Sequence, residues 1–443
     1  MDVKIKKGCD LKISGEAAKE IADFQSDKVA YSLADFKYLK PKVLVSEGDV
    51  VKAGQTLFID KKDDRVTFVS PVAGVVEEIR RGDRRVLLNV IIRKEGDDKV
   101  EFPVLDASAV SGLDADAAKE ALYSRGLWPC IQRRPYHKVA EIADAPSAIY
   151  VNCLDSNPLA ADPNFYLQDR LEDFKLGIEL LKKISSNIHL CLDGNQANIF
   201  QAEGTNQHSF SGVHPRGNLS VHIDSIDPIH DMSKVIWSVR AQEVAAIGKT
   251  LSTGSFDAER TIAYAGPAAE APKYYKTTLG ASTQALPTKE GEVRKISGSA
   301  LQGRGLGEEA YLGFYDNTIT ALSEDREQKI LGWLTPGFKS HSFTGCYATA
   351  VKPQGSYDFT TSTNGEHRAI VDSEMFDKVQ PLDIHTIFLY KSLLVEDIEE
   401  AERLGLWSVA PEDFALATYM DPSKNDFSAP LEKVLGMLYK EDN

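Results

Sequence analysis

The stretch from Lys40 to Arg93 decides the fold of the N-terminal part of the chain. It reads KPKVLVSEGDVVKAGQTLFIDKKDDRVTFVSPVAGVVEEIRRGDRRVLLNVIIR. Apolar residues alternate along it, at Val43, Val45, Leu57, Ile59, Val66, Phe68 and Val75, with the two-residue period of strands that bury one face. Glycine turns separate the runs, at Gly48, Gly54, Gly74 and Gly82. Short strands at this spacing predict a small closed β structure, because open strand edges would be left unpaired.

Two motifs within this stretch suggest what kind of β structure it is. They are VSEGDVVKAGQTL at 45–57 and SPVAGVV at 70–76, and together they resemble the biotinyl/lipoyl-carrier family. The resemblance implies a barrel-sandwich hybrid whose hairpin, in carriers, bears a modified lysine. Here the hairpin reads DKKDDR at 60–65, so Lys61 and Lys62 lie among charges. We favour a solvated hairpin tip over a lipoylated or biotinylated arm, since charge runs usually mark exposed faces.

Length and charge narrow the class of protein. With 443 residues and 42% hydrophobic content, the chain can form roughly three domains of about 150 residues. The 51 basic and 66 acidic residues give a net charge of −15. That balance disfavours binding to nucleic acid or to an anionic lipid surface, so small molecules and proteins are the expected partners.

Cysteine usage and hydropathy indicate the compartment. The five cysteines are Cys9, Cys130, Cys153, Cys191 and Cys346, with no C-x-x-C pair, which excludes local iron–sulfur and zinc patterns and predicts a reducing compartment. The N-terminus lacks the apolar run of a signal peptide, and no stretch approaches 18 apolar residues. We therefore expect a soluble, cytoplasmic chain that reaches a membrane only through partners.

The middle of the chain alternates strand and helix patterns. Apolar strand runs at 148–152 and 188–192 flank an amphipathic helix predicted over Phe165–Ile184. This βαβ unit predicts a doubly wound α/β domain. A dinucleotide site would need a glycine-rich turn before the helix, but residues 153–160 contain no glycine, and Asp155 would repel a phosphate. We expect a Rossmann-like domain without the nucleotide pocket.

A tryptophan and a basic cluster precede this domain. Trp128 is followed by Arg133-Arg134-Pro135-Tyr136-His137-Lys138, the densest basic run in an acidic protein. The run could hold an anion or dock an acidic partner. We favour the alternative that it is a surface loop whose arginines pair with the abundant Asp and Glu side chains.

Four histidines lie close together in the sequence, at His208, His214, His222 and His230. A metal site is conceivable, with His222 and Asp224 on one face of a strand predicted over Leu219–Ile223. Their spacing fits no common ligand pattern. We favour structural, hydrogen-bonding histidines and predict no metal site.

Weaker patterns complete the map. We expect a turn of helix at Ala17–Ala22, a helix over Leu113–Ser124 capped by Asp114, and strands around 343–365. The glycines of Gly303-x-Gly305-x-Gly307 precede no Lys-Ser/Thr pair, so we favour a turn over a phosphate loop. The end of the chain is predicted to be helical, over 395–404, 411–418 and 431–439.

Separated motifs along the whole chain resemble the NqrA family, the A subunits of the Na⁺-translocating NADH:quinone reductase, which is related to the C subunit of the Rnf complex. They are Lys6-Lys7-Gly8, Gly212–Gly217, His222-Ile223-Asp224 with Asp227-Pro228, Gly291–Gly303, and Phe359–Gly365 with Arg368 and Pro381–Ile384. In this family Gly291–Gly303 belongs to a soluble-ligand-binding (SLBB-like) β-grasp domain. The Rnf relatives carry cysteine clusters near the C-terminus, but this chain has no cysteine after Cys346.

Taken together, these patterns predict an α+β multidomain protein. We expect a biotinyl/lipoyl-like barrel-sandwich hybrid over 1–110, a Rossmann-like α/β domain over 111–257 and a β-grasp, SLBB-like domain over 258–330. A strand segment that returns to the core and a C-terminal helical domain would occupy 331–443.

The resemblance implies one component of a Na⁺-pumping NADH:ubiquinone or menaquinone oxidoreductase, a translocase, at the cytoplasmic face of the bacterial inner membrane. Its expected partners are the membrane and flavin-bearing subunits, through which NADH, flavins, iron–sulfur centres and quinone would act. We expect no cofactor in this chain and no complete catalytic site.

Two roles for the chain stay open, and we favour the second. It could hold quinone itself, or it could be a scaffold beside the quinone site formed by the membrane subunits. The candidate quinone or partner surface comprises Trp128, Arg133, Arg134 and His214. A third alternative is a stand-alone carrier or soluble-ligand-binding protein that uses the lipoyl-like hairpin.

Overall fold

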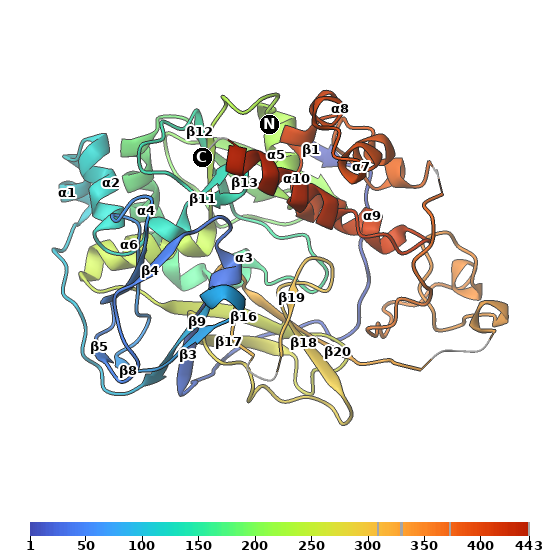
Figure 1. Cartoon of the computed structure of the whole chain (residues 1–443), viewed down its shortest axis with the longest axis horizontal. Coiled ribbons are helices and arrows are strands. Elements are labelled where there is room, and N and C mark those ends of the chain that lie inside the picture. The colour runs from blue at the N-terminus through green and yellow to red at the C-terminus, as the bar shows by residue number, and fades with distance from the viewer. Residues whose placement is uncertain (308–309, 328–330, 372–373, 442–443) are drawn as a thin grey trace.

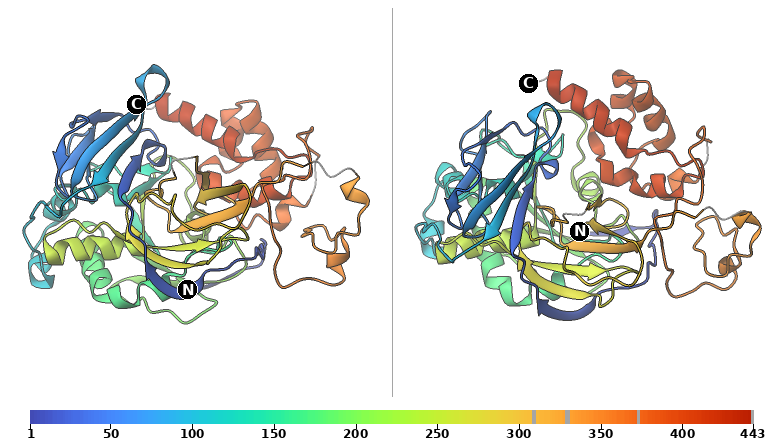
Figure 2. Two further views of the ribbon diagram at one scale, coloured as in Figure 1. Left: turned by 90° about the horizontal axis from the view of Figure 1, so that it is seen from below. Right: turned by 60° about the horizontal axis from the view of Figure 1, so that its bottom comes forward.

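The computed structural model describes residues 1–307, 310–327, 331–371 and 374–441. Within these ranges the strands form four sheets. Figure 1 shows the α/β part in green and cyan, with the C-terminal helices in red beside it and the β-grasp strands in yellow below. In Figure 2, helix α10 (Ser428–Glu441) extends from the other C-terminal helices toward the blue N-terminal strands.

Two small sheets form the N-terminal β structure, as the alternating pattern predicts. Their orders are β3-β9-β8-β5 and β4-β6-β7. The strands are β3 (Lys28–Ser32), β4 (Pro41–Val43), β5 (Val50–Val51), β6 (Thr56–Asp60), β7 (Thr67–Val69), β8 (Gly74–Arg81) and β9 (Leu87–Lys94). The rings of Phe58 and Phe68 stack with centroids 4.5 Å apart, and Tyr31 meets Phe58 edge-on at 5.6 Å. These buried aromatic contacts hold the core of the two sheets together.

The α/β part is built on a seven-stranded sheet of order β1-β14-β13-β12-β15-β10-β11. Its strands are β1 (Asp2–Ile5), β10 (Gln132–Arg134), β11 (Lys138–Val139), β12 (Ala148–Asn152), β13 (Ile188–Asp193), β14 (Asn206–Gly212) and β15 (Ile236–Arg240). The five strands from β1 to β15 run parallel, and β10 is antiparallel to β15. The predicted doubly wound arrangement is thus present, with an added antiparallel edge.

Helices α4 (Leu171–Ile184) and α6 (Ala241–Thr253) pack closely against each other beside this sheet. Gly177 of α4 and Gly248 of α6 face the partner backbone, where an added Cβ would overlap the carbonyl oxygens of Val244 and Asp173. Two glycines therefore permit the short distance between the helices. Two further helices, α1 (Ala107–Ser111) and α2 (Ala115–Tyr123), contact α4. The predicted cap of α2 is confirmed, because Asp114 accepts a hydrogen bond from the Ala117 amide at 2.8 Å.

Two predictions in this part were wrong. The single helix expected over Phe165–Ile184 is interrupted, with α3 (Pro163–Tyr166) and a 3₁₀ turn (Gln168–Arg170) ahead of α4. The strand expected over Leu219–Ile223 is helix α5 (Leu219–Ile226). Residues 220–223 of this helix are all buried, so it is enclosed on more than one side. The alternation of apolar residues at 219–223 therefore did not mark one buried face of a strand.

The third sheet has the order β19-β18-β20-β16-β17-β2. It contains β2 (Ala18–Asp23), β16 (Glu259–Ala265), β17 (Lys273–Thr278), β18 (Val293–Ser297), β19 (Arg304–Gly305) and β20 (Thr318–Ser323). The predicted turn of helix at Ala17–Ala22 was wrong, since β2 pairs in parallel with β17 at the edge of this sheet. The first 23 residues thus supply an edge strand to each of two sheets before the N-terminal β structure begins, because β1 pairs with β14.

The C-terminal part is helical, as predicted, and packs on the α/β part. Its helices are α7 (Thr386–Leu394), α8 (Ile398–Arg403), α9 (Ala415–Met420) and α10. One buried cluster joins Tyr150, Phe210 and Ile236 of the seven-stranded sheet to Phe427 and Leu431. Helix α7 had not been predicted, although its mostly buried residues are strongly apolar.

The segment 331–371 differs from the rest of the chain. Part of it projects from the body of the molecule (orange in Figures 1 and 2), whereas Tyr357 is buried and bridges to Ile13, and His341 Nδ1 lies 2.7 Å from the Tyr419 hydroxyl. The strands predicted around 343–365 were wrong, since the described residues of this segment contain 3₁₀ turns and isolated bridges such as Ser323 with Thr360. Several of its backbone groups bond to local hydroxyls, for example Cys346 N to Ser342 Oγ at 3.3 Å. Such local bonding competes with pairing to a sheet.

Candidate functional site

The carboxyl edge of the seven-stranded sheet contains a point at which the strand order reverses. From β12 the chain proceeds outward through β13 to β14, and it then returns to β15 on the other side of β12. In open α/β sheets, ligands bind outside the carboxyl ends of the strands at such a point. A cavity of about 590 Å³ lies there, next to Asn152 and Ser238 of the two strands.

Segments from every part of the chain line this cavity. The lining includes Lys37 from the N-terminal part and Glu412, Ala415, Asp426 and Glu432 from the C-terminal part. The β-grasp part contributes Gly298, Ser299, Leu301, Gln302, Gly303 and Tyr315–Thr318. Ser299 Oγ donates a hydrogen bond to Asn157 Oδ1 at 3.2 Å, which joins the β-grasp loop to the loop after β12. The volume falls in the range of small-molecule sites, about 300–1,000 Å³.

The loop after β12 is held by its own side chains. Asp155 Oδ1 accepts hydrogen bonds from the Asn157 backbone and side-chain nitrogens, at 2.9 and 2.8 Å. A carboxylate therefore occupies the turn where a dinucleotide-binding protein presents backbone N–H groups to a pyrophosphate. The absence of a nucleotide pocket stays a prediction.

The start of α6 contributes two charged side chains to the cavity wall. Arg240 ends β15, and its Nη1 donates to the carbonyl oxygen of Tyr315. Glu243 lies in the first turn of α6 and is 2% exposed. Burial raises the pKa of the Glu243 carboxyl, and the nearby Arg260 and Arg240 guanidinium groups oppose that rise.

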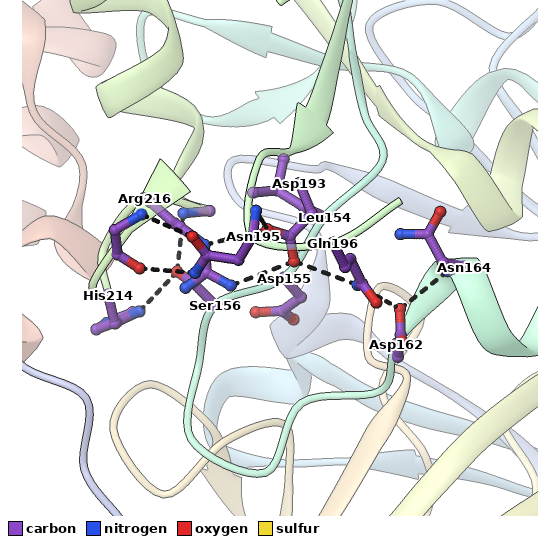
Figure 3. A network of polar contacts seen from close by, with 12 residues as sticks. Leu154, Asp155, Ser156, Asp162, Asn164, Asp193, Asn195, Gln196, His214 and Arg216 are labelled. Carbon is purple, nitrogen blue, oxygen red and sulfur yellow. Dashed lines mark hydrogen bonds and ion pairs between the residues drawn. The ribbon is translucent and has the colours of Figure 1, made fainter. Parts of the chain in front are cut away.

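The other half of the carboxyl edge is filled by polar contacts between loops (Figure 3). Ser156 Oγ lies 3.0 Å from His214 Nδ1 and accepts a hydrogen bond from the Gly217 amide at 2.8 Å. Arg216 Nη2 and Asp193 Oδ2 form an ion pair at 3.2 Å. These contacts tie the loops after β12, β13 and β14 together, although His214 Nε2 has no hydrogen-bond partner among the described residues. A smaller cavity of about 160 Å³ lies beside them, next to Asp155, Asp193 and Gln196. We call this part of the edge the closed half, because the cavity there is the smaller of the two.

The four residues of the predicted quinone or partner surface lie mainly in the interior. Trp128 is fully buried and donates from Nε1 to the Ala140 carbonyl at 2.7 Å. Arg133 pairs with Asp144 at 3.1 Å, and Arg134 pairs with Glu412 at 2.8 Å. The pairing expected for the basic cluster is therefore confirmed, but its placement in a surface loop was wrong, since Arg134, Tyr136 and Lys138 are buried.

His214 lies away from that cluster in the sequence and in its contacts. It is 1% exposed and belongs to the closed half through Ser156. Desolvation by burial, together with the nearby Arg216, lowers its pKa to about 3. A role of the four residues in quinone or partner binding stays a prediction.

Those histidines noted in the sequence whose side chains form hydrogen bonds each do so with a single partner. His189 Nδ1 and His208 Nε2 are 2.9 Å apart, and His222 Nε2 bonds the Arg216 carbonyl at 2.8 Å. His222 extends from a helix, so the predicted placement with Asp224 on one strand face was wrong. Within the described ranges, no group of three or more His, Cys, Asp and Glu side chains could hold a metal ion.

The lysine hairpin between β6 and β7 contacts the C-terminal helix. Lys62 Nζ donates to the Tyr439 hydroxyl at 2.8 Å and lies 4.6 Å from the centre of that ring. Lys62 thus binds another part of the same chain.

Sequence reasoning missed the residues that line the cavity, among them Arg240, Glu243, Asp316 and Glu412. A signal existed for the first two. A buried strand that ends at Arg240 and a helix that begins at Ala241 place residues 240–243 at a carboxyl edge, where ligands bind. Asp316 and Glu412 reach the cavity through tertiary packing, which no local pattern reports.

Comparison with known proteins gives consistent matches along the chain. Residues 3–95 match the family model described as the NqrA N-terminal barrel-sandwich hybrid domain, and residues 113–256 match the NqrA second alpha/beta domain. Residues 261–307 match the NQRA C-terminal domain, an SLBB model.

Three relatives that match over the whole length are named as the A subunit of the Na⁺-translocating NADH-quinone reductase. The protein of Marinomonas sp. is 38% identical over 443 residues, which cover 99% of both chains. The protein of Cellvibrio japonicus is 38% identical and that of Haemophilus influenzae 37% identical, each covering 99% of this chain and 100% of the relative.

Among solved structures, an NAD⁺-reducing [NiFe]-hydrogenase in the air-oxidised state matches with a TM-score of 0.33 and 12% identity, over 49% of this chain and 47% of that one. That similarity is too low to inform the function of this chain.

Proposed function

The chain belongs to the NqrA family, the A subunits of the Na⁺-translocating NADH-quinone reductase, and from that premise we propose how it works in the complex. It is one component of an oxidoreductase and translocase. We propose that it is a peripheral scaffold at the cytoplasmic face of the inner membrane, beside the quinone site of the membrane subunits. NADH, flavins and iron–sulfur centres would be bound by those partners. The observation that carries the proposal is the 38% identity over 99% of both chains.

The features of the chain support a scaffold over a catalytic component. In the described part of the chain, no helix is long and apolar enough to cross a membrane. The turn after β12 presents Asp155 where a nucleotide phosphate would lie. The division into segments 1–110, 111–257, 258–330 and 331–443 is part of the same proposal.

The projecting segment 331–371 is the surface that we propose for docking on the partner subunits. It carries large apolar side chains that are widely exposed, at Leu331 (55%), Leu334 (62%), Phe338 (70%) and Val351 (92%). Exposed apolar groups gathered in one region mark protein–protein contacts. Figure 2 shows part of the segment at the periphery of the molecule, where a partner can reach it.

Co-purification tests this docking surface. A tagged chain carrying Leu334→Asp and Phe338→Asp is expressed in its native cell and recovered from detergent-solubilised membranes. We expect a loss of roughly tenfold or more in co-purified partner subunits, since a charge in an apolar contact is left unpaired. The control is Val104→Asp, at a side chain of similar exposure (58%) in another loop, which should leave recovery unchanged. Undiminished recovery with the double variant would remove this segment from the proposal.

A further inference from the structure

The hairpin tip between β8 and β9 is rich in arginine. Residues 80–85 read RRGDRR, and Asp83 is the only acidic residue from 79 to 88. Arg80 is already paired, because its guanidinium donates to both oxygens of the Glu78 carboxylate, at 3.0 and 2.7 Å. The other three arginines are exposed and form no ion pair with any residue that the structure describes: Arg81, Arg84 and Arg85. We call residues 81–86 the arginine tip.

The turn itself does not account for these arginines. The backbones of Arg84 and Arg85 have φ values of 54° and 61°, in the left-handed region that asparagine and glycine adopt more readily than arginine does. Neither guanidinium group has a hydrogen-bond partner in the described part of the chain. A partner outside the chain explains the two side chains better than the fold does.

The tip also presents apolar surface, and it projects. Val86 is 59% exposed and Leu88 is 42% exposed. Figure 2 shows the hairpin in light blue at the edge of the molecule, beside the C-terminal end of α10 in both views. Cationic side chains next to exposed apolar ones are typical of segments that lie in the headgroup region of a bilayer. There the phosphates attract the cations, and the acyl boundary accepts the apolar groups.

The size of the tip favours a lipid surface over a protein partner. A stable protein interface takes about 20–30 residues and about 800 Å² from each partner, which is several times more than a short hairpin turn offers. A bilayer presents a continuous layer of phosphates and needs no matching groove. Arginine suits that layer, since its planar guanidinium donates two parallel hydrogen bonds to a phosphate.

The net charge of the whole chain, −15, does not prevent this contact. Salt screens charges over about 10 Å at 0.1 M ionic strength, so a projecting tip responds mainly to its own groups. Within the arginine tip, three guanidinium groups face one carboxylate, that of Asp83. The acidic remainder of the chain is repelled by an anionic surface, which favours an approach with the tip first.

We propose that the arginine tip binds the anionic phospholipid headgroups of a bilayer, with its guanidinium groups on the phosphates and Val86 at the acyl boundary. This surface is separate from the segment 331–371. It goes beyond the scaffold role, because the chain then contacts the membrane directly as well as through partner subunits.

Vesicle flotation of the purified full chain in about 0.1 M salt tests the proposal. We expect binding to vesicles of equimolar phosphatidylcholine and phosphatidylglycerol, and none to phosphatidylcholine alone. The double variant Arg84→Gln with Arg85→Gln should weaken binding roughly tenfold to thirtyfold, since each arginine at an anionic surface contributes about fivefold. The matched control is Arg326→Gln with Arg403→Gln, at side chains that are each 72% exposed. It removes the same charge and should bind as the wild type does.

The comparison of the two vesicle types uses the wild type alone and is independent of how any variant folds. Absence of binding to the anionic vesicles would overturn the proposal. Equal weakening by the two double variants would also overturn it, because net charge alone would then govern binding. A wild type that ignores vesicles, together with a tip variant that loses partner subunits in co-purification, would make the tip a protein contact instead.

The assay contains no partner subunit, so its outcome is distinct from that of the scaffold proposal. A chain that floats with anionic vesicles but elutes without partners would support the lipid contact and count against the scaffold role.

Discussion

The two halves of one sheet edge differ in the space that their loops enclose, about 160 Å³ beside Asp193 and Gln196 against about 590 Å³ beside Asn152 and Ser238. Where β12, β13 and β14 end, the loops bind one another through Ser156, His214 and the Arg216–Asp193 pair. Where β12 and β15 end, the loops leave a cavity of about 590 Å³ that the β-grasp and C-terminal parts cover. We call these the closed half and the open half. The comparison shows that the point where the strand order reverses does not by itself determine the size of a cavity. The segments packed over the strand ends determine it as well.

The largest expected loss of stability concerns the ion pair between Arg134 and Glu412, a residue of the C-terminal part that lines the open half. Arg134→Met removes the cation that holds Glu412, and both side chains are largely buried, at 5% and 18% exposure. An uncompensated buried charge should lower the free energy of unfolding by about 3–5 kcal/mol, measured by urea denaturation. Lys37→Met is the control, because its pair with Glu432 is exposed (35% and 53%) and should contribute about 0–1 kcal/mol. Equal losses in the two variants would contradict the account.

Low pH should lower the stability of the chain through the two buried histidines beside the closed half, His214 and His222. Burial lowers the pKa of His214 to about 3 and that of His222 to about 4. Below pH 6.5 the unfolded chain therefore takes up protons that the folded chain does not, and stability falls as the pH falls toward these values. Each histidine should cost up to about 2 kcal/mol by pH 5, at 1.36 kcal/mol per pH unit.

Thermal unfolding between pH 7.5 and 5 measures this slope. Asp413 acts in the opposite direction, because burial and the neighbouring Glu412 raise its pKa to about 6, so its protonation favours the folded chain as the pH falls. The decisive quantity is thus the difference between the wild type and His222→Asn, whose midpoint should depend less on pH. Parallel profiles would show that His222 is not held neutral.

A comparable effect is expected from one hydroxyl of the closed half. Ser156→Ala leaves His214 Nδ1 and the Gly217 amide without their shared partner. The expected loss of unfolding free energy is about 1–3 kcal/mol, again by urea denaturation. Ser108→Ala, at an exposed position of α1, should change it by less than about 0.5 kcal/mol. A loss no larger than the control would mean that the loops are held by other contacts.

The smallest effect concerns the contact between the lysine hairpin and α10. Tyr439→Phe removes the hydroxyl that accepts from Lys62 at 2.8 Å and from Lys138 at 3.3 Å. We expect the free energy of unfolding to fall by about 0.5–1.5 kcal/mol, measured by urea denaturation. Lys61→Ala, at an exposed residue of the same hairpin, should be neutral within about 0.5 kcal/mol.

The sequence predicted those parts of the fold that depend on local patterns. The glycine-separated strands of 40–93, the strands at 148–152 and 188–192 and the Asp114 cap have signals within a few residues of each other, and all are present. The helix expected at Ala17–Ala22 failed for the opposite reason. Its conformation as β2 is set by pairing with β17, which lies about 250 residues further along the chain, and non-local pairing overrides local preference.

The candidate site was less predictable for the same physical reason. The sequence alone indicated that Asp155 would repel a phosphate, because that prediction involves only the loop that follows one strand. Glu412 and Asp316 lie more than 150 residues from Asp155, and they line the same cavity through packing of separate parts of the chain. Trp128, Arg133 and Arg134 were expected at a surface, yet Trp128 and Arg134 are buried, and the two arginines pair with Asp144 and Glu412 of the same chain.

The most direct test of the central claim is an affinity pull-down of the tagged chain from detergent-solubilised membranes of its native cell. NADH:quinone reductase activity and its dependence on Na⁺ are assayed on the eluate. Co-purification of flavin-bearing membrane subunits with Na⁺-stimulated activity is the predicted result. A chain that elutes alone and without that activity would contradict the assignment to a working reductase complex.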